Sequence, residues 1–125
     1  MKVLLIEDPT LSKSVLFTTI AAGNLMDPQR DPSDPENKPE INGLAHFIEH
    51  MIFMGNSKHQ DEAFLNDFLK RNGGMKNGVT GPDHTQFFFE VKSSEFPKAC
   101  EYFSEYLISP KFDPSVMDRE IKIIE

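Results

Sequence analysis

The sequence predicts an α/β (α+β) fold, in which a mainly antiparallel sheet carries helices packed on one face. Two runs rich in β-branched and aromatic residues, Ser14–Ala22 and His84–Lys92, have the length and composition of strands. Other segments repeat apolar residues at the spacing of an amphipathic helix. The 125 residues are enough for one small domain with its own hydrophobic core.

Composition narrows the possible functions. Hydrophobic residues make up 38% of the chain and charged residues 26%, and the net charge is −7 without a basic block. This balance is typical of an acidic globular protein, and it argues against nucleic acid or an anionic membrane as partner. Cys100 is the only cysteine, so no internal disulfide can form and a cytoplasmic location is predicted.

The first forty residues are predicted to form a hairpin followed by a loop. Lys2–Glu7 is expected to be a strand, Asp8-Pro9 its turn, and Ser14–Ala22 the partner strand. The stretch 27–40 contains four prolines and seven charged residues, which forbid a helix or the interior of a strand. It is therefore predicted to be a surface loop within the domain.

Two helices are expected next. One covers residues 44–54, with Asn42 as its amino-terminal cap and Gly55 just past its end. The second begins at Asp61, buries an apolar face and ends at Asn72-Gly73-Gly74.

The remainder is predicted to continue as strands and helices. Residues 75–80 form a weak strand, and Gly81-Pro82-Asp83 is the turn into the strand that ends at Lys92. Ser94 is expected to cap a third helix, and Asp113-Pro114 opens a fourth. Because no capping residue closes the fourth helix, we expect the chain to be a fragment of a longer protein.

The first helix contains the sequence His46-Phe47-Ile48-Glu49-His50. Between Leu44 and Met54 only His46, Glu49 and His50 are ionisable. At about 100° per residue, these three side chains share an arc of roughly 100° on the helix. An apolar helix is expected to be buried, so three ionisable groups in it need a partner. A divalent metal ion with a water would satisfy all three.

This arrangement has the chemistry of a zinc site. Two histidines at i and i+4 can chelate one zinc ion, and a neighbouring glutamate can deprotonate a water. His-x-x-Glu-His is the inverzincin motif, and a hydrogen-bonded polar cluster without metal is the alternative. A catalytic zinc needs a third protein ligand. His59 and His84 are weaker candidates than Glu120, whose apolar neighbours suggest a metal ligand or a carboxylate that holds a histidine.

Several ordered blocks together resemble the amino-terminal catalytic domain of the insulinase (insulysin, pitrilysin) family of zinc peptidases. The blocks extend over nearly the whole chain, and the loop at 27–40 resembles an insertion. They are Lys2–Ile6 with Asp8-Pro9, Gly43–Gly55, Asn77 with Thr80, His84–Val91, and Asp118-Arg119-Glu120.

The resemblance implies Zn²⁺ as the cofactor, His46 and His50 as its ligands, and Glu49 as the general base. Glu120 falls on the first of two family glutamates one heptad apart and would support the site from behind the ligands. The resemblance implies that the second glutamate is the third zinc ligand and falls at about position 127. Helix geometry agrees with this, since seven residues return to nearly the same helix face. Glu125 is not expected to replace this ligand, because on a helix its side chain would point about 140° away from that of Glu120.

The resemblance also implies the substrate and the partners. The strand at Asn77, Gly78 and Thr80 would pair with the backbone of a peptide substrate. The expected activity is that of a zinc endopeptidase that hydrolyses oligopeptides together with the remaining domains of a longer protein. This chain alone, 1–125, would be a partial catalytic domain and inactive in isolation. A non-catalytic structural or binding module of the same fold is the alternative.

Overall fold

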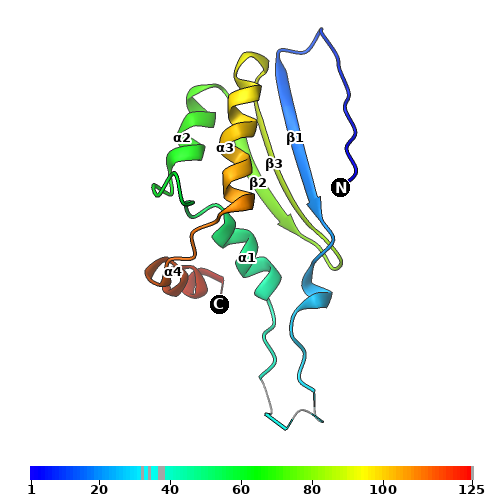
Figure 1. Cartoon of the computed structure of the whole chain (residues 1–125), viewed down its shortest axis with the longest axis vertical. Coiled ribbons are helices and arrows are strands. Elements are labelled where there is room, and N and C mark those ends of the chain that lie inside the picture. The colour runs from blue at the N-terminus through cyan, green and yellow to red at the C-terminus, as the bar shows by residue number, and fades with distance from the viewer. Residues whose placement is uncertain (32, 34, 37–38, 125) are drawn as a thin grey trace.

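A three-stranded antiparallel sheet with helices on one face forms the molecule (Figure 1). The computed structural model describes residues 1–31, 33, 35–36 and 39–124. The sheet has the order β1-β3-β2. The elements in chain order are β1 (Lys13–Ile20), the 3₁₀ turn η1 (Asn24–Met26), α1 (Leu44–Ile52), α2 (Phe64–Arg71), β2 (Met75–Thr80), β3 (Thr85–Lys92), η2 (Ser93–Glu95), α3 (Phe96–Ile108) and α4 (Pro114–Ile124). The predicted fold class is confirmed.

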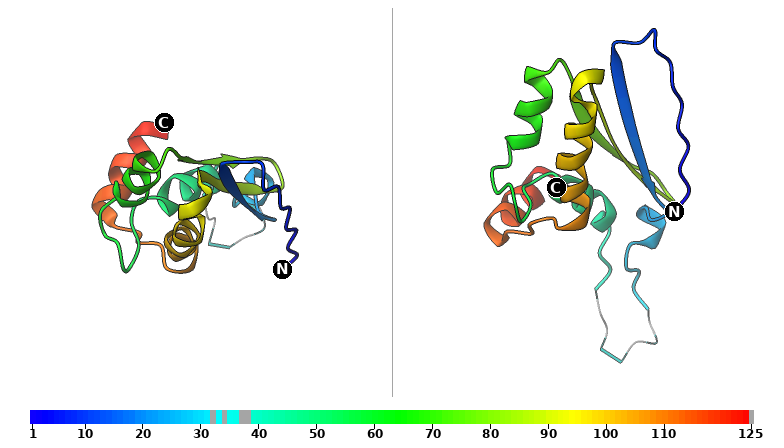
Figure 2. Two further views of the ribbon diagram at one scale, coloured as in Figure 1. Left: turned by 90° about the horizontal axis from the view of Figure 1, so that it is seen from above. Right: turned by 45° about the horizontal axis from the view of Figure 1, so that its top comes forward.

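Side chains along β3 alternate between buried and partly exposed, and this alternation identifies the buried face of the sheet. Phe87, Phe89 and Val91 are almost completely buried and point toward the helices. Phe88, between them, points to the opposite face, where it stacks on the exposed Phe17 of β1. Figure 2, seen from above, shows the helices gathered on one side of the sheet. The core therefore lies between the sheet and the helices.

Strand register places α1 beside β2. Lys76, Gly78 and Thr80 lie opposite Phe89, Phe87 and Thr85 in the ladder, so these three residues of β2 share the helix-covered face. α1 packs against β2 and also contacts α4. Its ionisable residues are thus held between a strand and the last helix.

The predicted strand Lys2–Glu7 and its hairpin are wrong. In the structure this segment forms no strand, and Leu4, Leu5 and Ile6 are each more than 80% exposed. β1 pairs instead with β3, about 70 residues later in the chain, in the register Lys13 to Lys92. Apolar composition indicates that a segment can extend, but a strand exists only where a partner completes its hydrogen bonds.

Two predicted caps are also wrong. Asn42 makes no capping hydrogen bond to α1, and its side-chain amide donates to Glu40 instead. Ser94 lies within η2, and α3 begins after Glu95 without any side-chain cap. The other predicted elements are confirmed to within a few residues. Of the predicted loop at 27–40, residues 32, 34, 37 and 38 lie outside the described residues, as does Glu125.

No helix among the described residues is long and apolar enough to cross a membrane.

Candidate metal and catalytic site

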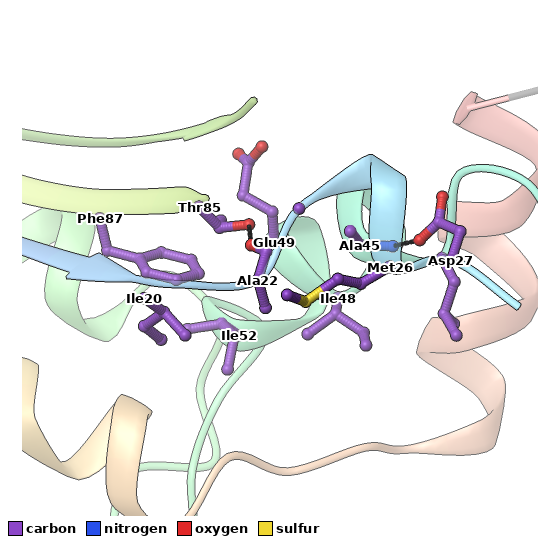
Figure 3. Close-up of a pocket in the computed structure, with 12 residues that line it drawn as sticks. Ile20, Ala22, Met26, Asp27, Ala45, Ile48, Glu49, Ile52, Thr85 and Phe87 are labelled. Atoms are coloured by element: carbon purple, nitrogen blue, oxygen red, sulfur yellow. Dashed lines mark hydrogen bonds between the residues drawn. The ribbon is translucent and has the colours of Figure 1, made fainter. Parts of the chain in front are cut away.

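The amino-terminus of α1 is fixed by a carboxylate from a distant part of the chain. Asp27 Oδ2 accepts from the backbone N–H of Gly43 and Oδ1 from that of Ala45, both at 2.8 Å. Gly43 has a φ of 81°, a conformation that glycine adopts without strain. Figure 3 shows the Asp27–Ala45 hydrogen bond at the edge of an apolar cavity of about 200 Å³. Because Asp27 is only 6% exposed, this cap is protected from water.

The two histidines converge as the i, i+4 spacing predicts. Their Nε2 atoms lie 3.2 Å apart, and their rings meet edge to face. His46 is exposed and His50 is half-buried. The expectation of a wholly buried helix was wrong, because only Met51 and Ile52 of α1 are buried. The pair therefore faces a space that solvent and a ligand can reach.

Glu120 approaches His50 from α4. Its Oε2 lies 3.3 Å from His50 Nδ1, and its Oε1 accepts from Arg119 Nε at 3.3 Å. Arg119 also pairs with Glu62 at 2.7 Å. Glu120 is only 4% exposed, so these partners take the place of water around its carboxyl oxygens. When His50 Nδ1 carries the proton, this contact holds the ring with its Nε2 lone pair directed toward His46.

Glu49 is positioned by β2. Thr80 donates from its hydroxyl to Glu49 Oε2 at 2.8 Å. A Cβ added to Gly78 would lie 2.5 Å from Glu49 Oε1, so the glutamate packs directly on the Gly78 backbone. Figure 3 shows the Glu49 carboxylate directed away from the apolar side chains of Ile48 and Ile52. Only a glycine leaves room for the carboxylate in this position.

The structure separates Asn77 from the other two residues of the predicted substrate strand. Gly78 and Thr80 lie on the face of β2 that contacts α1. Side chains alternate along a strand, so Asn77, which is exposed, points to the opposite face. Asn77 borders the pocket beside Glu49 and His50, whereas its side chain does not face Glu49.

The residues present fit a zinc ion. Two nitrogen ligands at about 2.0–2.1 Å from one tetrahedral ion lie about 3.3–3.4 Å apart, close to the observed 3.2 Å. Within the part of the chain that the structure describes, no group of three His, Cys, Asp or Glu residues could hold a metal ion. His84 pairs with Asp83, and His59 stacks on Phe64. Neither of these histidines joins the pair, so His46 and His50 are the two possible ligands that converge among the described residues.

Two residues near the site were missed from the sequence. The sequence did not indicate that Asp27 caps the helix, because it lies 16 positions before Gly43 and capping patterns are local. Lys76 lies two residues before Gly78 and shares its face of β2, so strand alternation could have found it. Its Nζ lies 3.9 Å from the centre of the Phe53 ring, in the pocket beside Glu49.

Three known proteins resemble the chain over nearly its whole length. Human insulin-degrading enzyme is 36% identical over 125 residues, which are 100% of this chain and 11% of that protein. The A-factor-processing enzyme of Saccharomyces cerevisiae is 35% identical over 99% of the chain and 11% of its own length. A Caenorhabditis elegans relative whose name describes a zinc protease is 35% identical over 97% of the chain and 13% of its own length.

A comparison with solved structures and a family model point to the same group of proteins as these relatives. A crystal structure of pitrilysin superimposes with a TM-score of 0.78 at 32% identity and covers 91% of the chain and 11% of that structure. The chain thus spans about a tenth of the length of these relatives. The model of the insulinase family, peptidase family M16, matches residues 2–125. The chain therefore belongs to the insulinase family of peptidases.

Proposed function

We propose that the chain is the metal-site part of a zinc-dependent endopeptidase that hydrolyses oligopeptides. The observation that carries the proposal is the 3.2 Å approach of His46 and His50 Nε2, with Glu49 beside them on the same helix. Glu120, 3.3 Å behind His50, would hold that ligand in place. Two neutral imidazoles and an adjacent carboxylate are the groups that zinc-dependent hydrolysis needs.

The chemistry would be divided between the metal and Glu49. A bound zinc ion lowers the pKa of a water and polarises a carbonyl group. Because Thr80 occupies Oε2 of Glu49, Oε1 remains to take the proton from the attacking water. The same carboxyl group would then pass this proton to the leaving amine of the cleaved peptide.

The open edge of β2 would bind the substrate backbone. Among the described residues β2 pairs only with β3, so its second edge is available to another strand. An extended peptide can add to such an edge through main-chain hydrogen bonds. Asn77, Gly78 and Thr80 lie on this strand, and the last two also touch Glu49. Pairing there would bring a peptide bond to the metal site.

The third zinc ligand would come from the continuation of α4, at about position 127, and the enclosure of the substrate would come from the remaining domains of a longer protein. The small share of the relatives that the chain covers supports this organisation. A cytoplasmic location stays a prediction, supported by a lone, half-buried Cys100.

Zinc content and cleavage of an oligopeptide by the full-length protein test the proposal. We expect one zinc per protein and a loss of cleavage on chelation. Glu49→Gln should lower kcat by at least about a thousandfold while zinc content is unchanged, because the variant loses only the base. Glu101→Gln, on the exposed face of α3, is the matched control and should leave both unchanged.

Two results would contradict the proposal. Cleavage that survives chelation, or full turnover by Glu49→Gln, would remove the zinc and base roles. A folded protein that cleaves no peptide would instead favour the non-catalytic module of the same fold.

A further inference from the structure

The pocket beside Glu49 has a second, positively charged end. A cavity of about 200 Å³ is lined by residues of α1 and β2, which contact each other. Its lining comes from α1, from the residues just after it and from β2: Glu49, His50, Phe53, Met54, Lys76, Asn77 and Gly78. The charged groups in this lining are Glu49, Lys76 and, when protonated, His50.

The register of α1 and β2 separates the two ends. Gly78 lies against Glu49, whereas Lys76, two residues earlier on the same strand face, lies over the Phe53 ring at 3.9 Å. The step of two residues from Gly78 to Lys76 along the strand covers about 6–7 Å, and the step of four residues from Glu49 to Phe53 along the chain covers about the same distance at helical rise. The ammonium group is thus about one side-chain length from the reacting end of the pocket.

Lys76 carries a positive charge that no carboxylate among the described residues contacts. In the part of the chain that the structure describes, its Nζ makes no salt bridge or hydrogen bond and rests only on the Phe53 ring. Burial, with a smaller contribution from the charge of Lys70, lowers the pKa of Lys76 to about 8. The ammonium form still predominates at pH 7. A half-buried ammonium group without an anionic partner favours a carboxylate that enters the pocket.

We propose that Lys76 is a specificity-determining residue that selects a glutamate side chain next to the scissile bond. The inference rests on the proposed peptidase function. Phe53 and Met54 provide an apolar wall for the methylene groups of the glutamate, and Lys76 pairs with its carboxylate. Aspartate is one methylene shorter and reaches the ammonium group less well. Glu49 does not occupy this end, because its Oε2 accepts from Thr80.

Matched peptides and the full-length protein test the inference. The peptides differ only in one residue beside the cleaved bond, which is Glu, Gln, Asp, Leu or Lys. For the unchanged protein we expect kcat/KM to be at least about tenfold higher with Glu than with Gln. Lys76→Gln should abolish this preference, Lys76→Glu should reverse it in favour of Lys, and Lys76→Arg should keep it.

The controls separate this inference from the proposed function. Lys98→Ala removes another lysine that lies over an aromatic ring, that of Tyr102, and should leave the preference unchanged. Cleavage that depends on Glu49 but shows no Glu preference, or a preference that survives Lys76→Gln, overturns the specificity role and leaves the peptidase intact. Absence of all cleavage, with every variant folded by circular dichroism, defeats the peptidase function first and the inference with it.

Discussion

Thr80 and Gly78 each contact one oxygen of the Glu49 carboxylate and so fix its orientation. Thr80 donates a hydrogen bond to Oε2 at 2.8 Å, and the Gly78 backbone packs against Oε1. A free glutamate side chain has several rotamers, and these two contacts favour the one seen in the structure. The two residues of β2 therefore orient Glu49, the proposed base, and leave His46 and His50 untouched.

Thr80→Val should lower kcat without changing zinc binding, because the hydroxyl that orients Glu49 is lost while side-chain shape is kept. We expect kcat to fall about tenfold and the free energy of unfolding to change by only about 1 kcal/mol. Zinc titration, peptide turnover and urea denaturation measure the three quantities. Thr18→Val on β1, which lies away from the site, is the matched control. Reduced zinc affinity in Thr80→Val would show a structural effect instead.

The element that carries the site, α1, depends on a cap that lies outside it in sequence. Asp27, the first residue of the proline-rich stretch 27–40, binds the first turn of the helix that follows this stretch. A negative charge at a helix amino-terminus is favourable, and the burial of Asp27 keeps water from competing for the two N–H groups. α4 contributes at the other side, where Glu120 contacts His50.

Asp27→Ala should destabilise the protein by about 2–3 kcal/mol, because it leaves the partly buried N–H groups of Gly43 and Ala45, at the amino-terminus of α1, without this acceptor. It should also weaken zinc binding, since His46 lies in the same first turn. Asp61→Ala removes a single exposed hydrogen bond, to the N–H of Ala63, and should cost less than about 1 kcal/mol. Urea unfolding compares the two variants, and equal losses would contradict the capping role.

The whole molecule is built on one buried sheet face. Phe89 is fully buried and contacts the rings of Phe96 and Phe103, whereas the neighbouring Phe88 stacks on the exposed Phe17. A domain of this size has little stability to lose. One face of β3 therefore holds the helices in place, and the other contributes little to the core.

Phe89→Ala should destabilise the protein by about 3–5 kcal/mol, since it opens a cavity in the core. Phe88→Ala should lower the free energy of unfolding clearly less, because the Phe88 ring is already partly in contact with water. Thermal unfolding of both variants measures the difference. Similar losses would mean that the open face is also covered in solution.

The sequence by itself determined the convergence of His46 and His50, because the i, i+4 spacing on a helix depends only on local backbone geometry. It also predicted most helices and strands, since apolar periodicity and turn residues act within a few positions. The tertiary structure decided which strands pair, and so left Lys2–Glu7 without a partner. It also decided that Asp27 caps α1 and that Lys76 shares a pocket with Glu49. These contacts join residues far apart in the chain, and their distances follow from packing of the whole domain, which no local pattern encodes.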